Sequence, residues 1–163
     1  MRPVRCLILS ALSVLLVAAA AFAGTLPAAG TWVYDNSATV KSTPGHASIT
    51  AYVRISDSER SVTSFDGIVI GGKCRKGGHV SPAGTIGFSM KKNKVIEIGT
   101  SGRFSATRKA VGDATGVKGS VKVKGVIEGT KLSGKVTAHL HNPNFGDCRG
   151  SGKFSRAKGE QVG

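Results

Sequence analysis

Residues 117–140 read V-K-G-S-V-K-V-K-G-V-I-E-G-T-K-L-S-G-K-V-T-A-H-L, and this stretch decides the fold. A two-residue turn at Gly129-Thr130, with glycine first as a type II′ turn prefers, sets Glu128 opposite Lys131 and fixes every pair beyond it. The resulting pairs are Ile127 with Leu132, Val123 with Val136, Val121 with Ala138, Lys124 with Lys135, Lys122 with Thr137 and Ser120 with His139. The period of two and the β-branched residues exclude a helix and predict a hairpin with one apolar and one cationic face.

One pair in this hairpin is unusual, because Gly125 falls opposite Gly134 on the apolar face. Both positions lack the side chain that a core-facing residue should supply. Either the hairpin bends sharply there to close a barrel or wrap a sandwich edge, or a large side chain from another strand covers the gap. We favour curvature.

The rest of the chain predicts an all-β fold. Residues 46–55 alternate strictly between apolar and polar, and residues 62–70 form a second apolar segment that Asp66-Gly67 interrupts as a bulge or turn. Trp32 and Tyr34 share one face of an earlier strand, where we expect them to cover an edge of the core. Further strands are predicted at residues 85–91, 95–98, 103–108 and 150–158. We therefore expect a single antiparallel sandwich or small barrel of about eight to nine short strands.

The N-terminal residues predict export. Arg2 and Arg5 precede an apolar run over residues 7–22 that ends in Ala21-Phe22-Ala23, the pattern of a signal peptide cleaved after residue 23. An uncleaved anchor is the alternative. No other segment is long and apolar enough to cross a membrane, so we expect no span in the mature chain and a secreted, extracellular location. The mature protein then divides into an N-terminal segment with a possible edge strand (residues 24–38), a β domain (39–158) and a frayed tail (159–163).

Cleavage of the signal would leave two cysteines, Cys74 and Cys148. In an exported chain such a pair most simply forms a disulfide. Two free thiols or half of a metal site are the alternatives.

Short motifs in the second half of the chain resemble a group of small exported bacterial all-β proteins, common in actinobacteria, for which no activity is established. The motifs are Phe104-Ser105-Ala106-Thr107-Arg108, the lysine- and glycine-rich hairpin at residues 116–140, and a cysteine-led last strand with S-G-x-aromatic-x-A-K/R at residues 151–158. The resemblance covers roughly residues 39–158 and implies the β fold and export, but no catalytic residues. An extra residue after Cys148, together with Arg156, leaves the register of the last strand open.

Candidate chemistry is sparse. His139 and His141 would lie on the same face of one strand. Together with Asp147, and supplemented by His46, they could form the metal site of a small hydrolase, which is the alternative hypothesis for the function. The neighbouring lysines oppose the binding of a metal cation. The sequence contains no G-x-S-x-G or H-E-x-x-H motif, and we predict no catalytic residue and no cofactor.

Charge is the remaining signal, because the formal net charge of +14 becomes +12 without Arg2 and Arg5. Like charges side by side cost stability, so the lysine row favours an anionic partner such as a cell-wall polymer or polysaccharide. Solubility alone is the simpler explanation. The residues concerned are Lys118, Lys122, Lys124 and Lys135.

Two other classes of partner are the alternatives. Nucleic acid is unlikely, because the face lacks aromatic residues for stacking bases and the protein is expected to be exported. The third possibility is a protein-interaction or inhibitor module, presenting a basic, flexible loop that begins at Gly71, ends at Ser81 and is stiffened by Cys74.

Overall fold

Nine strands make up the part of the chain that the structure describes. The computed structural model describes residues 25–36, 45–90, 95–112 and 116–162, and the expected signal peptide lies outside them. Within these residues there is no helix, which confirms the all-β prediction. The strands are β1 (Gly30–Asp35), β2 (Gly45–Ile55), β3 (Arg60–Lys76), β4 (His79–Met90), β5 (Ile96–Glu97), β6 (Arg103–Gly112), β7 (Lys118–Glu128), β8 (Lys131–Asn142) and β9 (Gly146–Val162).

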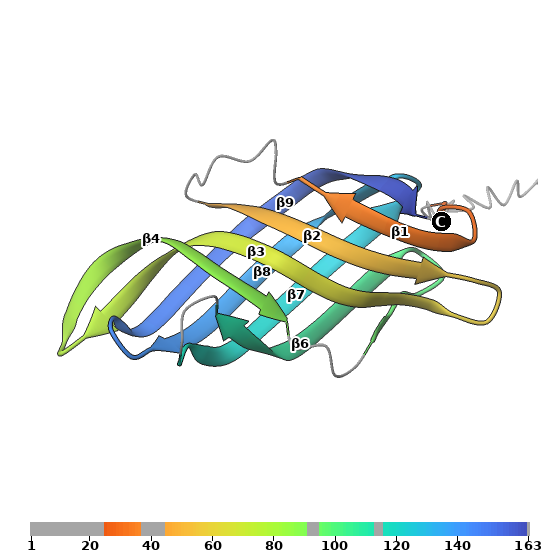
Figure 1. Cartoon of the computed structure of the whole chain (residues 1–163). Coiled ribbons are helices and arrows are strands. Elements are labelled where there is room, and N and C mark those ends of the chain that lie inside the picture. Colours follow the sequence, from red (N-terminus) through yellow and green to blue (C-terminus); the bar gives the residue numbers. More distant parts are fainter. Residues whose placement is uncertain (1–24, 37–44, 91–94, 113–115, 163) are drawn as a thin grey trace, which may run out of the picture.

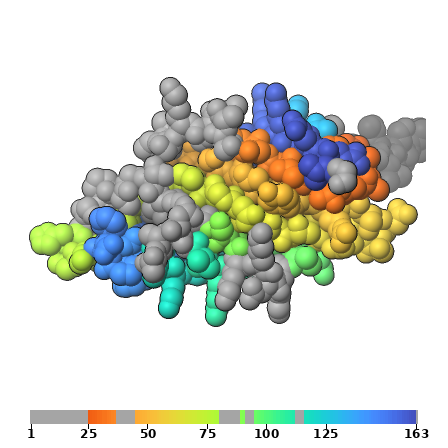
Figure 2. Space-filling view, in the orientation of Figure 1, coloured from red at the N-terminus to blue at the C-terminus, as the bar shows by residue number. Residues whose placement is uncertain are grey.

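The strands form one strongly curled sheet in the order β1-β2-β9-β8-β7-β6-β4-β3-β5. β9 pairs with β8 along one edge and with β1, β2 and β3 in turn along the other. All pairs are antiparallel except a short parallel contact between the start of β2 and the middle of β9. Figure 1 shows β1, β2 and β3 in front of β7, β8 and β9, and Figure 2 shows the side chains of the front strands side by side. The sheet is therefore neither two separate sheets nor a regular barrel.

The β7–β8 hairpin has the predicted register at every pair, from Glu128 opposite Lys131 to Ser120 opposite His139. Gly129 has φ of +55°, and Arg156 is the only described residue other than glycine with a positive φ, so Thr130 keeps a negative φ. This combination is the one a type II′ turn requires. Val121, Val123 and Val136 are fully buried, and the apolar face of the hairpin therefore forms part of the core.

The paired glycines of this hairpin are covered by aromatic rings from other strands, which is the alternative to the favoured interpretation as a point of curvature. Phe104 of β6 lies opposite Gly125, and Phe154 of β9 lies opposite Gly134. A Cβ atom on either glycine would collide with the tip of the facing ring. Phe104 and Phe154 are 5% and 1% exposed, so both rings belong to the core. The glycines thus provide the space that the two rings occupy.

The N-terminal strand is internal and is not the edge strand that its position suggested. β1 pairs with β2 on one side and with the end of β9 on the other. Trp32 and Tyr34 are both buried, as expected of residues that cover the core. The Tyr34 hydroxyl donates a hydrogen bond of 2.9 Å to the carbonyl oxygen of Gly129, and burial raises the pKa of Tyr34 to about 12. This aromatic residue therefore links β1 to the turn of the central hairpin.

The end of the chain also differs from expectation. The predicted frayed tail instead continues β9 to Val162, because its backbone pairs with β1. Two residues of β9, Ser155 and Arg156, lie opposite the single residue Ser133, which produces a bulge with Arg156 at φ +54°. The backbone N–H of Arg156 donates to the Ser133 hydroxyl at 3.1 Å. The register that the sequence left open is therefore resolved by one extra residue in β9.

Candidate functional site

A cationic surface covers the outward side of β6, β7, β8 and β9, and we call it the lysine face. Its central row crosses three strands, because Lys124 lies opposite Lys135 and Lys135 lies opposite Lys153. Residues directly opposite in an antiparallel pair have Cβ atoms about 4.5–5.5 Å apart. From this row to the start of β7, the exposed cations of this face are Lys109, Lys118, Lys122, Lys124, Lys135, Arg149 and Lys153, whereas Arg103, Lys131 and Lys158 lie beyond the row at the other end of the strands.

The structure brings together all four lysines predicted from the sequence and adds three cations that were missed, Lys109, Lys153 and Arg149. Lys153 could have been placed outward, because the next residue, Phe154, was expected to face the core. Its position beside Lys135 could not have been predicted, since nothing in the local pattern pairs β8 with β9. The contact between these strands extends the lysine row from two residues to three.

No carboxylate interrupts the middle of the lysine face. Three successive rows across β6–β9 contain only Ser, Thr, Lys, His and Arg on the outward side. In the described part of the chain, none of the lysines in these rows forms an ion pair within 4.0 Å. Like charges directly opposite one another destabilise a sheet, so the arrangement costs stability that an anion would restore.

The histidines do not assemble a metal site in the described residues. His141 Nδ1 lies 2.7 Å from Asp147 Oδ1, in an exposed pair across β8 and β9. His139 follows on the same outward side, and His46 lies opposite Lys153 at the start of β2. No three His, Cys, Asp or Glu side chains of the described ranges are grouped so that they could hold a metal ion. The predicted hydrolase site therefore lacks a third ligand there.

The Cys74–Cys148 disulfide is present and joins β3 directly to β9. Because successive side chains of a strand point to opposite faces, the buried cysteines direct their neighbours outward. Lys73 then lies opposite Arg149, and Arg75 lies opposite Asp147. The disulfide thus fixes a second group of cations next to the lysine face.

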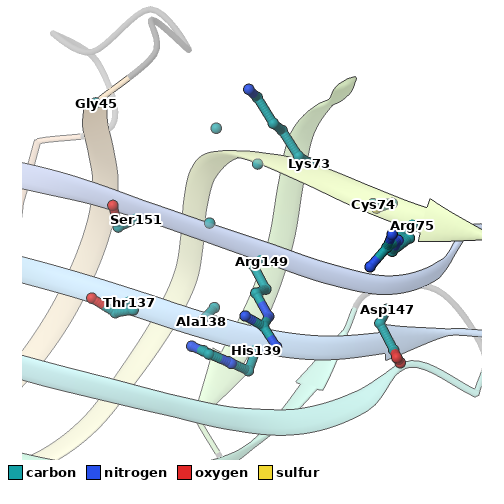
Figure 3. Close-up of a pocket in the computed structure, with 13 residues that line it drawn as sticks. Gly45, Lys73, Cys74, Arg75, Thr137, Ala138, His139, Asp147, Arg149 and Ser151 are labelled. Carbon is teal, nitrogen blue, oxygen red and sulfur yellow. The ribbon is translucent and has the colours of Figure 1, made fainter. Parts of the chain in front are cut away.

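These cations surround a hollow of about 890 Å³ between β3, β8 and β9. Figure 3 shows Arg149 and His139 next to each other, Arg75 on β3 beside Cys74, and Lys73 on the same strand with its side chain extending away from them. Hydroxyl groups of Thr137 and Ser151 also line the hollow. Part of its wall consists of glycines, namely Gly45, Gly71, Gly72 and Gly150, which leave backbone atoms uncovered.

The expected flexible loop at this end is a β-hairpin. The strands β3 and β4 continue on both sides of a tight turn at Gly77-Gly78, where φ is +58° and +85°. Lys76 Nζ donates to the carbonyl oxygen of Asn144 at 2.7 Å, which connects this turn to the β8–β9 turn. Paired backbone on both sides makes the segment part of the sheet, and the prediction of a loop was wrong.

No helix in the described part of the chain has the length and apolar character needed to cross a membrane. No family model, curated protein or solved structure matches this chain. The function must therefore be argued from the lysine face and the adjoining hollow themselves.

Proposed function

We propose that the protein is exported and binds an anionic polymer of the cell surface or its surroundings through the lysine face, without catalysing a reaction. The observation that supports this most directly is the row Lys124–Lys135–Lys153, in which three ammonium groups lie side by side on neighbouring strands. A surface kept positive only for solubility would gain stability from interspersed carboxylates. A polymer with regularly spaced negative charges matches an uninterrupted array of this kind.

Two further features support the proposal. The disulfide is typical of proteins that fold in an oxidising compartment outside the cytosol. The lysine face carries no outward aromatic side chain on β6–β9, which favours a polymer held by charge over a nucleic acid held by base stacking. The resemblance to small exported bacterial β proteins remains a prediction that agrees with this assignment.

Binding to immobilised dextran sulfate, with neutral dextran as reference, tests the proposal. We expect retention on the sulfated polymer at low salt that falls steeply as the salt concentration rises, because exposed charges are screened within about 8 Å at physiological ionic strength. Purified bacterial cell-wall material is the second probe. Retention on neutral dextran, or retention that salt leaves unchanged, would contradict an electrostatic lysine face.

A matched pair of variants separates the lysine face from net charge. The first replaces the central row with Lys124→Gln, Lys135→Gln and Lys153→Gln. The control removes the same number of charges from exposed residues outside this row. The control substitutions are Arg54→Gln, Arg60→Gln and Lys76→Gln, all of them on β2 or β3. We expect the first variant to lose at least about tenfold in affinity for dextran sulfate and the control to lose much less. Equal losses would assign the binding to overall charge.

A further inference from the structure

We infer that the hollow between β3, β8 and β9 is a binding site for a single tetrahedral oxyanion, a phosphate or sulfate group. This site rests on the proposed function, because it would hold one anionic group of the polymer whose other charges lie along the lysine face. The surface is continuous between the two, since Lys109, Ser120, His139, Arg149 and Lys73 follow one another across five strands.

The cationic side chains of the hollow come from β3 and β9. Arg149 on β9 lies between His139 on β8 and Lys73 on β3. Arg75 lies further along β3, beside Cys74 (Figure 3). Among the described residues that line the hollow, Asp147 carries the only carboxylate, and it already forms the 2.7 Å contact with His141. The hollow is therefore cationic where a ligand would lie.

The shape of the hollow suits a compact anion better than the flat surface of β7 does. β3 and β9 pair directly at this point, with Gly72 opposite Gly150, and Gly71, Gly72 and Gly150 all line the hollow. With glycine on both strands, no side chain fills the wall, and an anion can approach the backbone. Arg75 and Arg149 each present a planar fork of N–H donors, which matches pairs of oxygens on phosphate or sulfate.

The disulfide gives the site its rigidity. Cys74 and Cys148 are adjacent to all four charged residues contributed by β3 and β9, because each lies one residue from a cysteine. Their Cα atoms are 3.9 Å apart, so the two strands cannot separate while the bond is intact. A cationic cluster held in place in this way does not have to be assembled when the anion binds, which lowers the cost of binding.

Titration of the folded protein with inorganic phosphate, inorganic sulfate and acetate, followed by amide chemical shifts, tests the site. We expect saturable shifts with phosphate or sulfate at Gly71, Gly72, Gly150 and Ser151, and weaker binding of acetate, whose planar carboxylate has only two oxygens. Stronger binding of phosphate than of sulfate would indicate that the natural ligand carries phosphate groups, and stronger binding of sulfate would indicate a sulfated ligand. Absence of saturable shifts at these residues, or acetate binding as tightly as both, would overturn the inference.

Two single substitutions provide the control. Arg149→Gln should weaken phosphate or sulfate binding by roughly tenfold or more, because it removes a charged fork of hydrogen-bond donors. Arg54→Gln removes the same charge from β2 and should change binding by no more than about twofold. Equal weakening by both variants would overturn the site. The two proposals can also be rejected separately. If the protein binds phosphate but not dextran sulfate, the proposed function is rejected and the site in the hollow stands. If it binds dextran sulfate but neither phosphate nor sulfate, only the site in the hollow is rejected.

Discussion

Substitution of Gly125 by alanine tests whether the central hairpin is shaped by the aromatic ring that covers it. The new Cβ atom would collide with the tip of the Phe104 ring and lie 3.1 Å from the Ser133 carbonyl oxygen. Phe104 has little room to move, because it is 5% exposed and its ring centroid lies 5.9 Å from that of Phe65. Overpacking of this kind costs about 1–3 kcal/mol, and we expect the free energy of unfolding to fall by that amount.

A double-mutant cycle identifies the cause. Phe104→Leu removes the tip atoms of the ring, so Gly125→Ala in that background should cost little, giving a coupling free energy of about 2 kcal/mol. Gly134→Ala is the contrasting case, because its Cβ would also meet the backbone of Lys124 and Gly125. Gly134→Ala should therefore still lower the free energy of unfolding in the Phe154→Leu background. Urea unfolding of the single and double variants measures both cycles, and additive effects at Gly125 and Phe104 would refute this explanation of the glycine pair.

Three further predictions concern charge, cross-linking and alkaline pH. Lys135→Gln should raise the free energy of unfolding by about 0.2–1 kcal/mol at low salt and by less at high salt, since it removes the central charge of the lysine row; a loss of stability in urea titrations would contradict like-charge repulsion. Replacing Cys74 and Cys148 together by alanine should cost about 4 kcal/mol, because the disulfide spans 74 positions; an unchanged thermal midpoint would disprove this. The pKa of Tyr34 is near 10 in the unfolded chain and about 12 in the folded protein, so the unfolded chain loses this proton first as the pH rises. The contribution of Tyr34 to the free energy of unfolding is therefore complete below pH 10 and falls by on the order of 2 kcal/mol as the pH rises to 12. Tyr34→Phe should remove that part of the alkaline loss, and identical pH profiles would reject the assignment.

The features that the sequence predicted correctly are local. The turn at Gly129-Thr130 set the register of a whole hairpin, because in an antiparallel pair one fixed contact determines all the others. Alternation over residues 47–55 placed the buried side of β2 correctly. The bulge expected at Asp66-Gly67 occurs where the β2–β3 register shifts, with Gly67 at φ +56°. In each of these cases, a few residues that are neighbours in the sequence are enough to predict the local structure.

The features that were missed depend on contacts between distant segments. Nothing close to Gly125 in the sequence indicates that Phe104 and Phe154 arrive from the two flanking strands. The residues around Gly71 were expected to form a loop, because glycine and charge are typical of loops, yet β4 and β9 pair with that segment on both sides. The hollow beside the lysine face results from these same long-range pairings, so its residues could be read from the sequence only one at a time.

The position of β9 also determines when the protein can fold. Its residues complete the hydrogen bonding of β1, β2, β3 and β8, and Thr31 near the start of the described chain pairs with Val162 near its end. The strands synthesised first must therefore stay without this partner until β9 itself has been synthesised. Folding should be late and all-or-none, with the slow kinetics of a protein rich in distant contacts. For a chain exported as we propose, that delay keeps it in the extended state that a narrow translocation channel requires.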